Sequence, residues 1–231
     1  TETVGDLTWS YTISQVNTAT VTGVTPVPEE LELPSALNGY PVVAVGASSF
    51  QGLNGLAKVV VPDSITSIGG GAFYNCTKLG EVKFGAGLTT IHGHSSSSTD
   101  TDGSNGYAQY GAFANCSALS NVVFNAGLKK INNQCFGQCK ALKELSFPDS
   151  VETIGVQCFY SCTALERVSF GTGLKSIGTY AFAVSPALKE VTFAPQDIPQ
   201  LTIGESAFRS CQSLERVTFS EALKTIQPSA F

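Results

Sequence analysis

The residues with the most obvious chemical capacity lie in one polar stretch, residues 92–111, which reads HGHSSSSTDTDGSNGYAQYG. It holds both histidines of the chain, His92 and His94, and the carboxylates Asp100 and Asp102. Imidazole nitrogens and carboxylate oxygens are common zinc ligands, so these four side chains are candidate metal ligands. They do not form an EF-hand calcium loop. Counted from Asp100, the sixth position is Asn105 instead of glycine, and the twelfth is Gly111 instead of glutamate.

Two tyrosines, Tyr107 and Tyr110, stand near the end of the same stretch, after its four consecutive serines. Surface loops frequently carry binding residues, so a protrusion that binds a ligand through these tyrosines is a second hypothesis. The third hypothesis is a solvated loop without a ligand, which a repeat protein tolerates because its stack stays intact. The serine-rich composition of the stretch favours this third hypothesis.

An internal repeat determines how all these residues are positioned. The segment 151–173 has the form L-x-x-I-x-x-x-A-F-x-x-C-x-x-L-x-x-V-x-F, and the pattern returns 23 residues earlier and 23 residues later. A fixed period of this length is typical of a solenoid. The phenylalanine that follows the small residue marks each coil, and it occurs at Phe50, Phe73, Phe113, Phe136, Phe159, Phe182, Phe208 and Phe231.

The spacing of these phenylalanines locates two insertions. Their intervals are 23, 40, 23, 23, 23, 26 and 23 residues, so two coils carry 17 and 3 additional residues. The flanking spacings place the long insertion at 92–111, between Ile91 and Ala112, and the short one at 194–200. Because the sequence stops at Phe231 inside a coil, we expect the last repeat to be incomplete and the natural chain to continue.

The motif A-F-x-x-C-x-x-L-x-x-V-x-F-P resembles the repeat of BspA-like leucine-rich repeat proteins over residues 31–231, and its departures from the pattern are few. Leu53 and Ser185 replace the cysteine, and Val61 replaces the strand phenylalanine. The resemblance implies a leucine-rich repeat solenoid that forms a right-handed arc. It implies a concave parallel β-sheet of about eight short strands, with short helical or irregular turns on the convex side.

The residue pattern leads to the same fold without the resemblance. In L-x-x-V-x-F, the valine and the phenylalanine alternate inward with a period of two, which predicts a short strand. Stacked coils then place equivalent outward side chains beside one another. From the fourth coil onward two such rows alternate in sign, Lys143, Glu166, Lys189 and Glu215 in one and Glu144, Arg167, Glu190 and Arg216 in the other.

This charge pattern predicts ladders of weak exposed ion pairs that control the register of the strands. Because the ladders neutralise themselves, the sheet suits a protein or glycan surface better than a charged ligand, and small molecules prefer a pocket. Two uncharged outward residues of the third coil, Asn121 and Val123, are candidate ligand contacts on this face.

The seven cysteines follow the repeat as well. Five occupy one inward position, and Cys135 and Cys158 take the position of the alanine before the phenylalanine. The shared register favours buried free thiols that act as small apolar side chains. Disulfides between adjacent coils are disfavoured because parallel stacked side chains rarely meet the required torsion, and metal ligation remains a third alternative.

The first 30 residues predict a cap. Residues 7–13 alternate between apolar and polar side chains, and a second β-prone run follows at 19–24, which indicates a hairpin. We expect residues 1–30 to form an N-terminal β-hairpin cap in which Trp9 packs on the first coil, and residues 31–231 to form the solenoid.

Composition excludes several classes of protein. The net charge of -5 provides no basic face for nucleic acid, and no run of 18 apolar residues predicts a transmembrane helix. The chain contains no methionine, so we expect either that a leader, including a signal peptide, has been removed or that the chain is cut from a longer one. An extracellular or cell-surface location fits that expectation.

The resemblance implies a non-enzymatic protein- or glycan-binding module of a bacterial cell-surface or secreted protein, active in adhesion or host interaction. Its partner would be a host or bacterial surface protein or glycan. The alternative is a structural spacer or assembly segment of a longer surface protein. An enzyme is disfavoured because the sequence shows neither a Ser/His/Asp or Cys/His arrangement outside the repeat register nor a glycine-rich phosphate loop.

The sequence therefore predicts no catalytic residue, no bound metal and no cofactor. We expect a monomer or a weak end-to-end dimer. The candidate ligand contacts are Tyr107, Tyr110, His92, His94, Asp100, Asp102, Asn121 and Val123.

Overall fold

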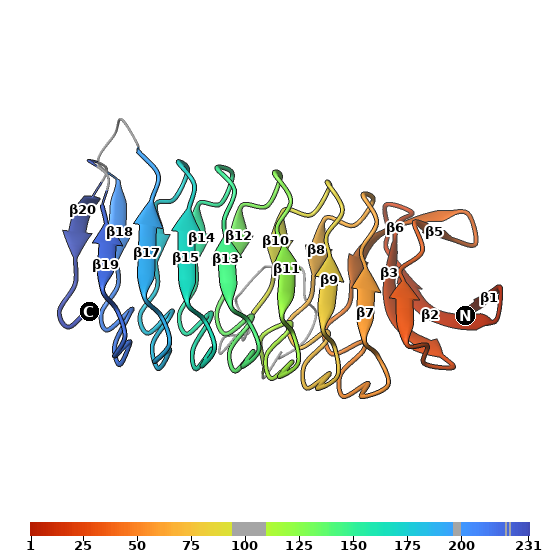
Figure 1. The fold of residues 1–231 in the computed structure, drawn as a ribbon. Coiled ribbons are helices and arrows are strands. Elements are labelled where there is room, and N and C mark those ends of the chain that lie inside the picture. The colour runs from red at the N-terminus through yellow and green to blue at the C-terminus, as the bar shows by residue number, and fades with distance from the viewer. Residues whose placement is uncertain (94–109, 196–199, 220, 222) are drawn as a thin grey trace.

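Short parallel strands, stacked coil upon coil, form two sides of an elongated β-solenoid (Figure 1). The computed structural model describes residues 1–93, 110–195, 200–219, 221 and 223–231. Within these residues the strands belong to one long sheet and to two shorter ones, and no helix is present. We number the coils by their marker phenylalanines, from Phe50 in coil one to Phe208 in coil seven.

The long sheet contains twelve of the described strands. Its spatial order is β1 (Glu2–Val4), β2 (Leu7–Ile13), β3 (Ala19–Thr25), β6 (Tyr40–Val45), β8 (Ser67–Ile68), β10 (Thr90–Ile91), β12 (Lys130–Ile131), β14 (Thr153–Ile154), β16 (Ser176–Ile177), β18 (Leu201–Ile203) and β20 (Leu223–Ile226). A short strand, β5 (Ala36–Leu37), pairs with β6 beside this path. Most of these strands come from the L-x-x-I part of the repeat.

The two shorter sheets, here called the front sheets, come from the V-x-F part of the repeat. One contains β4 (Glu30–Glu32), β7 (Lys58–Val60), β9 (Glu81–Lys83) and β11 (Asn121–Val123). The other contains β13 (Glu144–Ser146), β15 (Arg167–Phe170), β17 (Glu190–Phe193) and β19 (Arg216–Thr218). The pairing between adjacent strands is parallel and in register, as in Glu144 opposite Arg167 and Glu190 opposite Arg216.

The third side of each coil is a turn, and backbone hydrogen bonds join it to the turns of the adjacent coils. The N–H of each marker phenylalanine donates to the carbonyl of the residue before the next marker, as from Phe113 to Cys135 at 2.7 Å and from Phe136 to Cys158 at 2.8 Å. These backbone groups would otherwise be buried without partners. Hydrogen bonds therefore connect adjacent coils along this side as well as along the sheets.

Stacked aromatic rings fill the interior. The eight marker phenylalanines form a continuous row, with centroids 5.0–5.2 Å apart between consecutive rings. The front strands supply a second row from Phe84 to Phe219, which meets the first row edge to face, for example at Phe147 and Phe159. Such stacked and T-shaped contacts each contribute about 0.5–1.5 kcal/mol beyond the burial of apolar area.

The predicted fold class, a leucine-rich repeat solenoid with parallel strands, is confirmed. The eight short strands that were expected are present, from β4 to β19, but they form two sheets of four strands instead of one continuous sheet. Of the two kinds of turn that the resemblance allowed, the described residues show irregular turns. The long sheet was not expected, because most of its repeat strands are only two or three residues long and bury one isoleucine without a clear alternating pattern.

The hairpin at the N-terminal end is confirmed. Strands β2 and β3 pair antiparallel, and β3 then pairs with β6 in parallel, so the hairpin extends the long sheet beyond the first coil. Trp9 is 2% exposed and belongs to the core. The boundary of the cap at residue 30 stays a prediction.

The recurring cysteine is explained by a hydrogen bond. In five coils its thiol donates to the carbonyl of the marker phenylalanine of the preceding coil, as from Cys116 to Phe73 at 3.1 Å and from Cys139 to Phe113 at 3.3 Å. The free thiols, six buried and one half-buried, confirm the interpretation as small apolar residues. Ser185 holds this position in coil six, and its buried hydroxyl has no hydrogen-bond partner among the described residues.

The variant Ser185→Cys should raise the free energy of unfolding by about 1–2 kcal/mol, because an unsatisfied buried hydroxyl costs about 1–3 kcal/mol. The reverse change at the same repeat position, Cys162→Ser, should lower it by a similar amount. Urea denaturation followed by circular dichroism measures both. A Ser185→Cys variant less stable than the parent would contradict this explanation.

Close packing between coils leaves no space for a side chain at some glycines, whereas other glycines have space for one. A Cβ on Gly173 would lie 2.0 Å from the Asp149 carbonyl oxygen, whereas a Cβ on Gly137 would meet no atom closer than 3.6 Å. Gly173→Ala should therefore lower the free energy of unfolding by about 2–3 kcal/mol through overpacking. Gly137→Ala should change it by less than about 1 kcal/mol, with a gain expected from reduced unfolded-state entropy. Equal losses in the two variants, measured by thermal denaturation, would contradict the packing.

Candidate functional site

The thiols do not form a reactive site. Burial raises the pKa of Cys76 and of Cys211 to about 11 and that of Cys162 to about 12, and it holds the pKa of Cys139 and Cys158 well above the ordinary range. At neutral pH these thiols are protonated, and the thiolate is the form that attacks electrophiles or binds metals. Their role is in the core.

The candidate metal ligands are not brought together by the described residues. His92 follows β10 and is 7% exposed, while His94, Asp100, Asp102 and Tyr107 lie outside the described residues. Across the described ranges, no group of three or more histidine, cysteine or acidic side chains is arranged to hold a metal ion. The metal hypothesis for the long insertion therefore stays untested.

Ion pairs connect the outward side chains of the second front sheet. Arg167 pairs with Glu144, Arg216 with Glu190 at 3.1 Å, and Lys189 with Glu166 at 3.2 Å. These are members of the two predicted ladders, and the side chains are largely exposed. Each pair is therefore worth no more than about 1 kcal/mol and acts mainly on register and surface charge.

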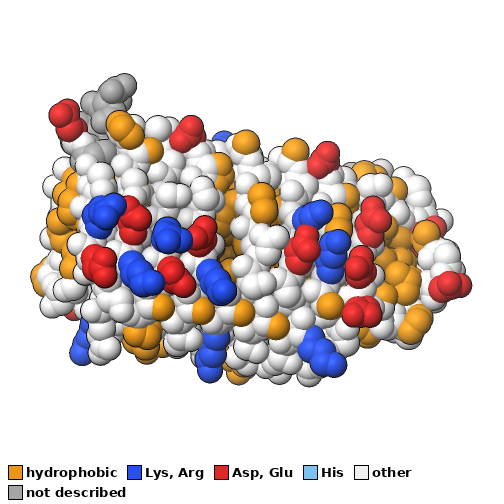
Figure 2. Space-filling view, in the orientation of Figure 1, with side chains coloured by type: hydrophobic (Ala, Val, Ile, Leu, Met, Phe, Trp, Pro, Cys, Tyr) orange, Lys and Arg blue, Asp and Glu red, His pale blue; other side chains and the backbone are white. Residues whose placement is uncertain are grey.

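A second group of charged side chains lies on the first front sheet, where Lys58 approaches Glu30 at 3.8 Å and Lys83 approaches Glu81 at 3.7 Å. Figure 2 shows the two charged groups separated by an uncharged band over β11, and the second group begins at Glu144 on β13. We call this band the neutral strip and define it by four outward residues. They are Ser120, Asn121, Val123 and Ser146.

The neutral strip coincides with a break in the sheet. Among the described strands no pairing joins β11 to β13, although the long sheet and the turn hydrogen bonds continue past this point. A shallow groove of about 350 Å³ extends from Val122 across β13 to β17. Its lining includes Glu144, Arg167 and Glu190, so the groove lies over the second charged group. Val123 is 62% exposed and belongs to β11, so an exposed apolar side chain stands between the two charged groups.

The sequence placed Asn121 and Val123 on the outward face of one strand, and the structure agrees. Their role as ligand contacts stays a prediction. The break between β11 and β13 had no sequence signal, because the 23-residue interval and the inward Val122 and Leu145 are both regular.

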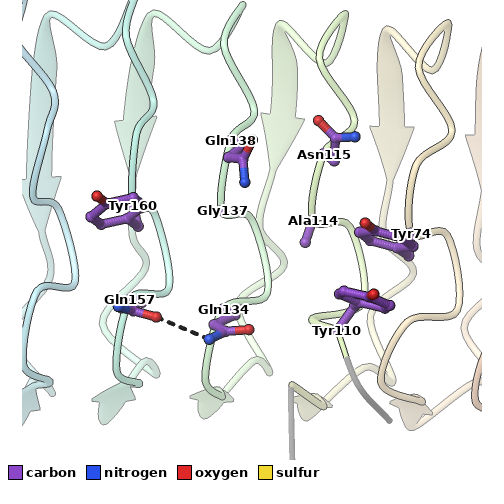
Figure 3. A pocket seen from close by; sticks show the side chains of 9 residues that line it. All are labelled: Tyr74, Tyr110, Ala114, Asn115, Gln134, Gly137, Gln138, Gln157 and Tyr160. Carbon is purple, nitrogen blue, oxygen red and sulfur yellow. Dashed lines mark hydrogen bonds between the residues drawn. The ribbon is translucent and has the colours of Figure 1, made fainter.

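Tyr110 takes part in a second surface feature, on the turn side of the solenoid. Its ring stacks on Tyr74 with centroids 3.8 Å apart and planes 5° apart. Burial and the neighbouring Tyr110 raise the pKa of the Tyr74 phenol. The stacked pair stands at one end of a groove of about 360 Å³ that Figure 3 shows from close by, here called the tyrosine–amide groove.

The other residues of this groove come from three successive coils. They are Ala114, Asn115, Gln134, Gly137, Gln138, Gln157 and Tyr160. Of the predicted site residues that the structure describes, Tyr110 alone lines this groove. Sequence reasoning missed the groove because the repeat motif leaves the residue after the marker phenylalanine undefined.

Comparison with known proteins places this geometry in a family. The model of the BspA type leucine rich repeat region matches six copies over residues 30–101 and 107–231. A search of curated proteins finds no significant match. The described residues contain no helix that could span a membrane.

Solved structures show the same fold. A leucine-rich repeat protein of Treponema pallidum is 27% identical with a TM-score of 0.77, and the match covers 93% of this chain and 91% of that one. A leucine rich cell surface protein of Faecalibacterium prausnitzii is 26% identical with a TM-score of 0.72, covering 95% of this chain and 54% of that one. A leucine-rich repeat protein of Bacteroides ovatus shares the fold at 20% identity and a TM-score of 0.59, over 97% of this chain and 76% of that one.

Because burial raises the pKa of the thiols, we expect the free energy of unfolding to fall at alkaline pH. The folded pKa of Cys76 and Cys211 is raised from 9.0 to about 11, so above pH 9 the unfolded chain loses these protons first. The free energy of unfolding should be independent of both thiols below pH 8. It should then fall by up to about 1.4 kcal/mol per pH unit for each thiol as pH rises from 9 towards 11.

Urea denaturation at intervals from pH 7 to pH 10.5 measures this slope. The double variant Cys76→Ala and Cys211→Ala provides the control, since tyrosines and lysines also titrate in this range. The variant should show a shallower decline than the parent. Identical slopes would contradict the assignment to these thiols.

Proposed function

The chain belongs to the BspA-type leucine-rich repeat family, and from this premise we propose that it is a non-enzymatic binding module of a bacterial cell-surface or secreted protein. Proteins of this family are usually surface proteins. We assign it a role in adhesion or host interaction, with a surface protein or glycan as its partner. The cell-surface relative of Faecalibacterium prausnitzii supports the location by similarity.

The observation that carries the proposal is the neutral strip. A regular solenoid could continue its charge ladders from one end to the other, and here the ladders stop at β11 and resume at β13. The strip combines exposed apolar area at Val123 with the amide of Asn121 and the hydroxyls of Ser120 and Ser146. Depletion of charge at the centre with a charged surround is the usual composition of a protein interface.

The charged groups on either side would act on specificity and on the rate of encounter. Each ladder contains both signs, so neither group favours a partner of high net charge. Exposed charges around an uncharged centre change the association rate and exclude mismatched partners more than they add affinity. We therefore expect a partner surface that is neutral at its centre and mixed in charge at its edge.

The double variant Asn121→Arg with Val123→Thr tests this proposal. The arginine would stand between Glu81 and Glu144 and would complete the ladder, so folding should be unchanged or more stable by up to about 1 kcal/mol. The threonine copies Thr192 and Thr218, which hold the same position in β17 and β19. Binding to immobilised host matrix proteins and bacterial surface proteins should fall at least tenfold.

The matched control is Val16→Arg, which places the same charge on a residue that is 78% exposed and far from the strip in the sequence. It should bind as the parent does. Surface plasmon resonance compares the three proteins. If the double variant still binds the partner, the neutral strip is not the binding surface. If the parent is well folded but binds no protein or glycan, the spacer function is favoured.

A further inference from the structure

We propose that the tyrosine–amide groove binds an uncharged oligosaccharide, with Tyr74 and Tyr110 as its aromatic platform. This inference rests on the proposed binding function and narrows it to one ligand class at one place. The groove lies on the turn side of coils two to five, away from the front sheets that carry the neutral strip (Figure 3).

The groove exists because two coils carry small residues where their neighbours carry tyrosine. The residue after the marker phenylalanine is Tyr74 in coil two, Ala114 in coil three, Gly137 in coil four and Tyr160 in coil five. Marker rings in these coils are 5.1–5.2 Å apart, so the two tyrosines stand about 15 Å apart, three strand spacings of ~4.8 Å. Ala114 and Gly137 form the floor between them.

One wall offers an aromatic face. The rings of Tyr74 and Tyr110 lie 3.8 Å apart and almost parallel, so each holds the other in place. Tyr110 is 38% exposed, which leaves part of the pair open to solvent. Tyrosine combines a rigid apolar face with a hydroxyl that hydrogen-bonds, and this combination suits a ring with C–H groups on one face and hydroxyls at its rim.

The rest of the groove offers amides. Gln134 donates from Nε2 to Oε1 of Gln157 at 2.9 Å, and Asn115 donates from Nδ2 to Oδ1 of Asn75 at 2.6 Å. Each of these bonds uses one donor or one acceptor of an amide that has two of each kind. Figure 3 shows Gln134 and Gln157 side by side on one edge of the groove, with Asn115 and Gln138 along the other.

Amides that both donate and accept match hydroxyl groups, which also do both. The described residues that line the groove are all uncharged, so among them an ionised ligand would find no countercharge. Its volume of about 360 Å³ lies within the range of roughly 300–1,000 Å³ that is usual for small-ligand sites. An uncharged polyhydroxylated ligand is the class that these features fit.

An extended peptide fits less well. Peptides commonly bind by adding a strand, which needs free backbone N–H and carbonyl groups. The N–H groups of Asn115, Gln134 and Gln138 already donate to carbonyls of the following coil at 2.7–2.9 Å. The groove therefore presents side-chain amides and aromatic rings rather than a backbone edge.

Filling the groove tests the proposal without disturbing the core. The double variant Ala114→Tyr with Gly137→Tyr gives the middle coils the residue of their neighbours. A Cβ on Gly137 meets nothing closer than 3.6 Å, and its backbone conformation is one that any residue adopts, so the variant should fold. Tyr110→Ala removes the platform instead, and Arg209→Tyr makes the same kind of change at the equivalent position of coil seven, outside the groove.

The probe is an array of immobilised neutral oligosaccharides, with sialylated and sulfated ones for comparison, followed by titration calorimetry with the neutral oligosaccharide that binds most strongly. The parent and Arg209→Tyr should bind it equally. The filled variant and Tyr110→Ala should lose at least tenfold in affinity. Circular dichroism and thermal denaturation confirm that each variant is folded.

Three outcomes would overturn the inference, and they differ from failure of the proposed function. A parent that binds surface proteins but no neutral oligosaccharide keeps the binding function and removes this site. Oligosaccharide binding that survives in the filled variant but is lost in Asn121→Arg with Val123→Thr moves the glycan to the neutral strip. Preference for the sialylated or sulfated probes would show that an uncharged ligand is the wrong class.

Discussion

The row of stacked phenylalanine rings is the interaction on which the rest of this structure depends. Consecutive rings are 5.0–5.2 Å apart from Phe50 to Phe231, close to the spacing of ~4.8 Å between hydrogen-bonded strands. Because the two spacings agree, ring stacking and backbone pairing reinforce each other in every coil. One coil could bury none of these rings by itself, so stability comes from the contact between neighbours.

A stack of this kind limits which positions can vary. An inward residue faces its equivalents in the coils on both sides, so Gly173 against the Asp149 carbonyl leaves no space for a Cβ. An outward residue meets its equivalents only at the surface, where one substitution costs little. Distinct surfaces can therefore arise from a few departures at outward positions. Ala114 and Gly137 make a groove in this way, and Asn121 and Val123 interrupt a charge ladder.

The sequence was sufficient for the fold class and for the charge ladders of the front sheets, since both depend on side chains whose types recur at a fixed interval. The ion pairs between Arg216 and Glu190 and between Lys189 and Glu166 followed from two rows of alternating charge and in-register strands. The long sheet was missed because most of its repeat strands have two residues and bury a single isoleucine, which is too short for an alternating pattern. The Tyr74–Tyr110 stack joins coil two to a residue near the end of the long insertion, and no local pattern predicts such a contact.

Sequence analysis did not find the groove for a different reason: the groove arises where two coils have a small residue in place of the tyrosine of their neighbours. Small residues such as Ala114 and Gly137 give no signal of binding by themselves, and they become informative only when the register aligns them with Tyr74 and Tyr160. The neutral strip has the same character, since Asn121 stands where the ladder would place a cation between two glutamates. Both surfaces include coils three and four but lie on different sides of them. A ligand in the groove would leave the front face accessible, so one solenoid could hold an oligosaccharide and a protein partner at the same time.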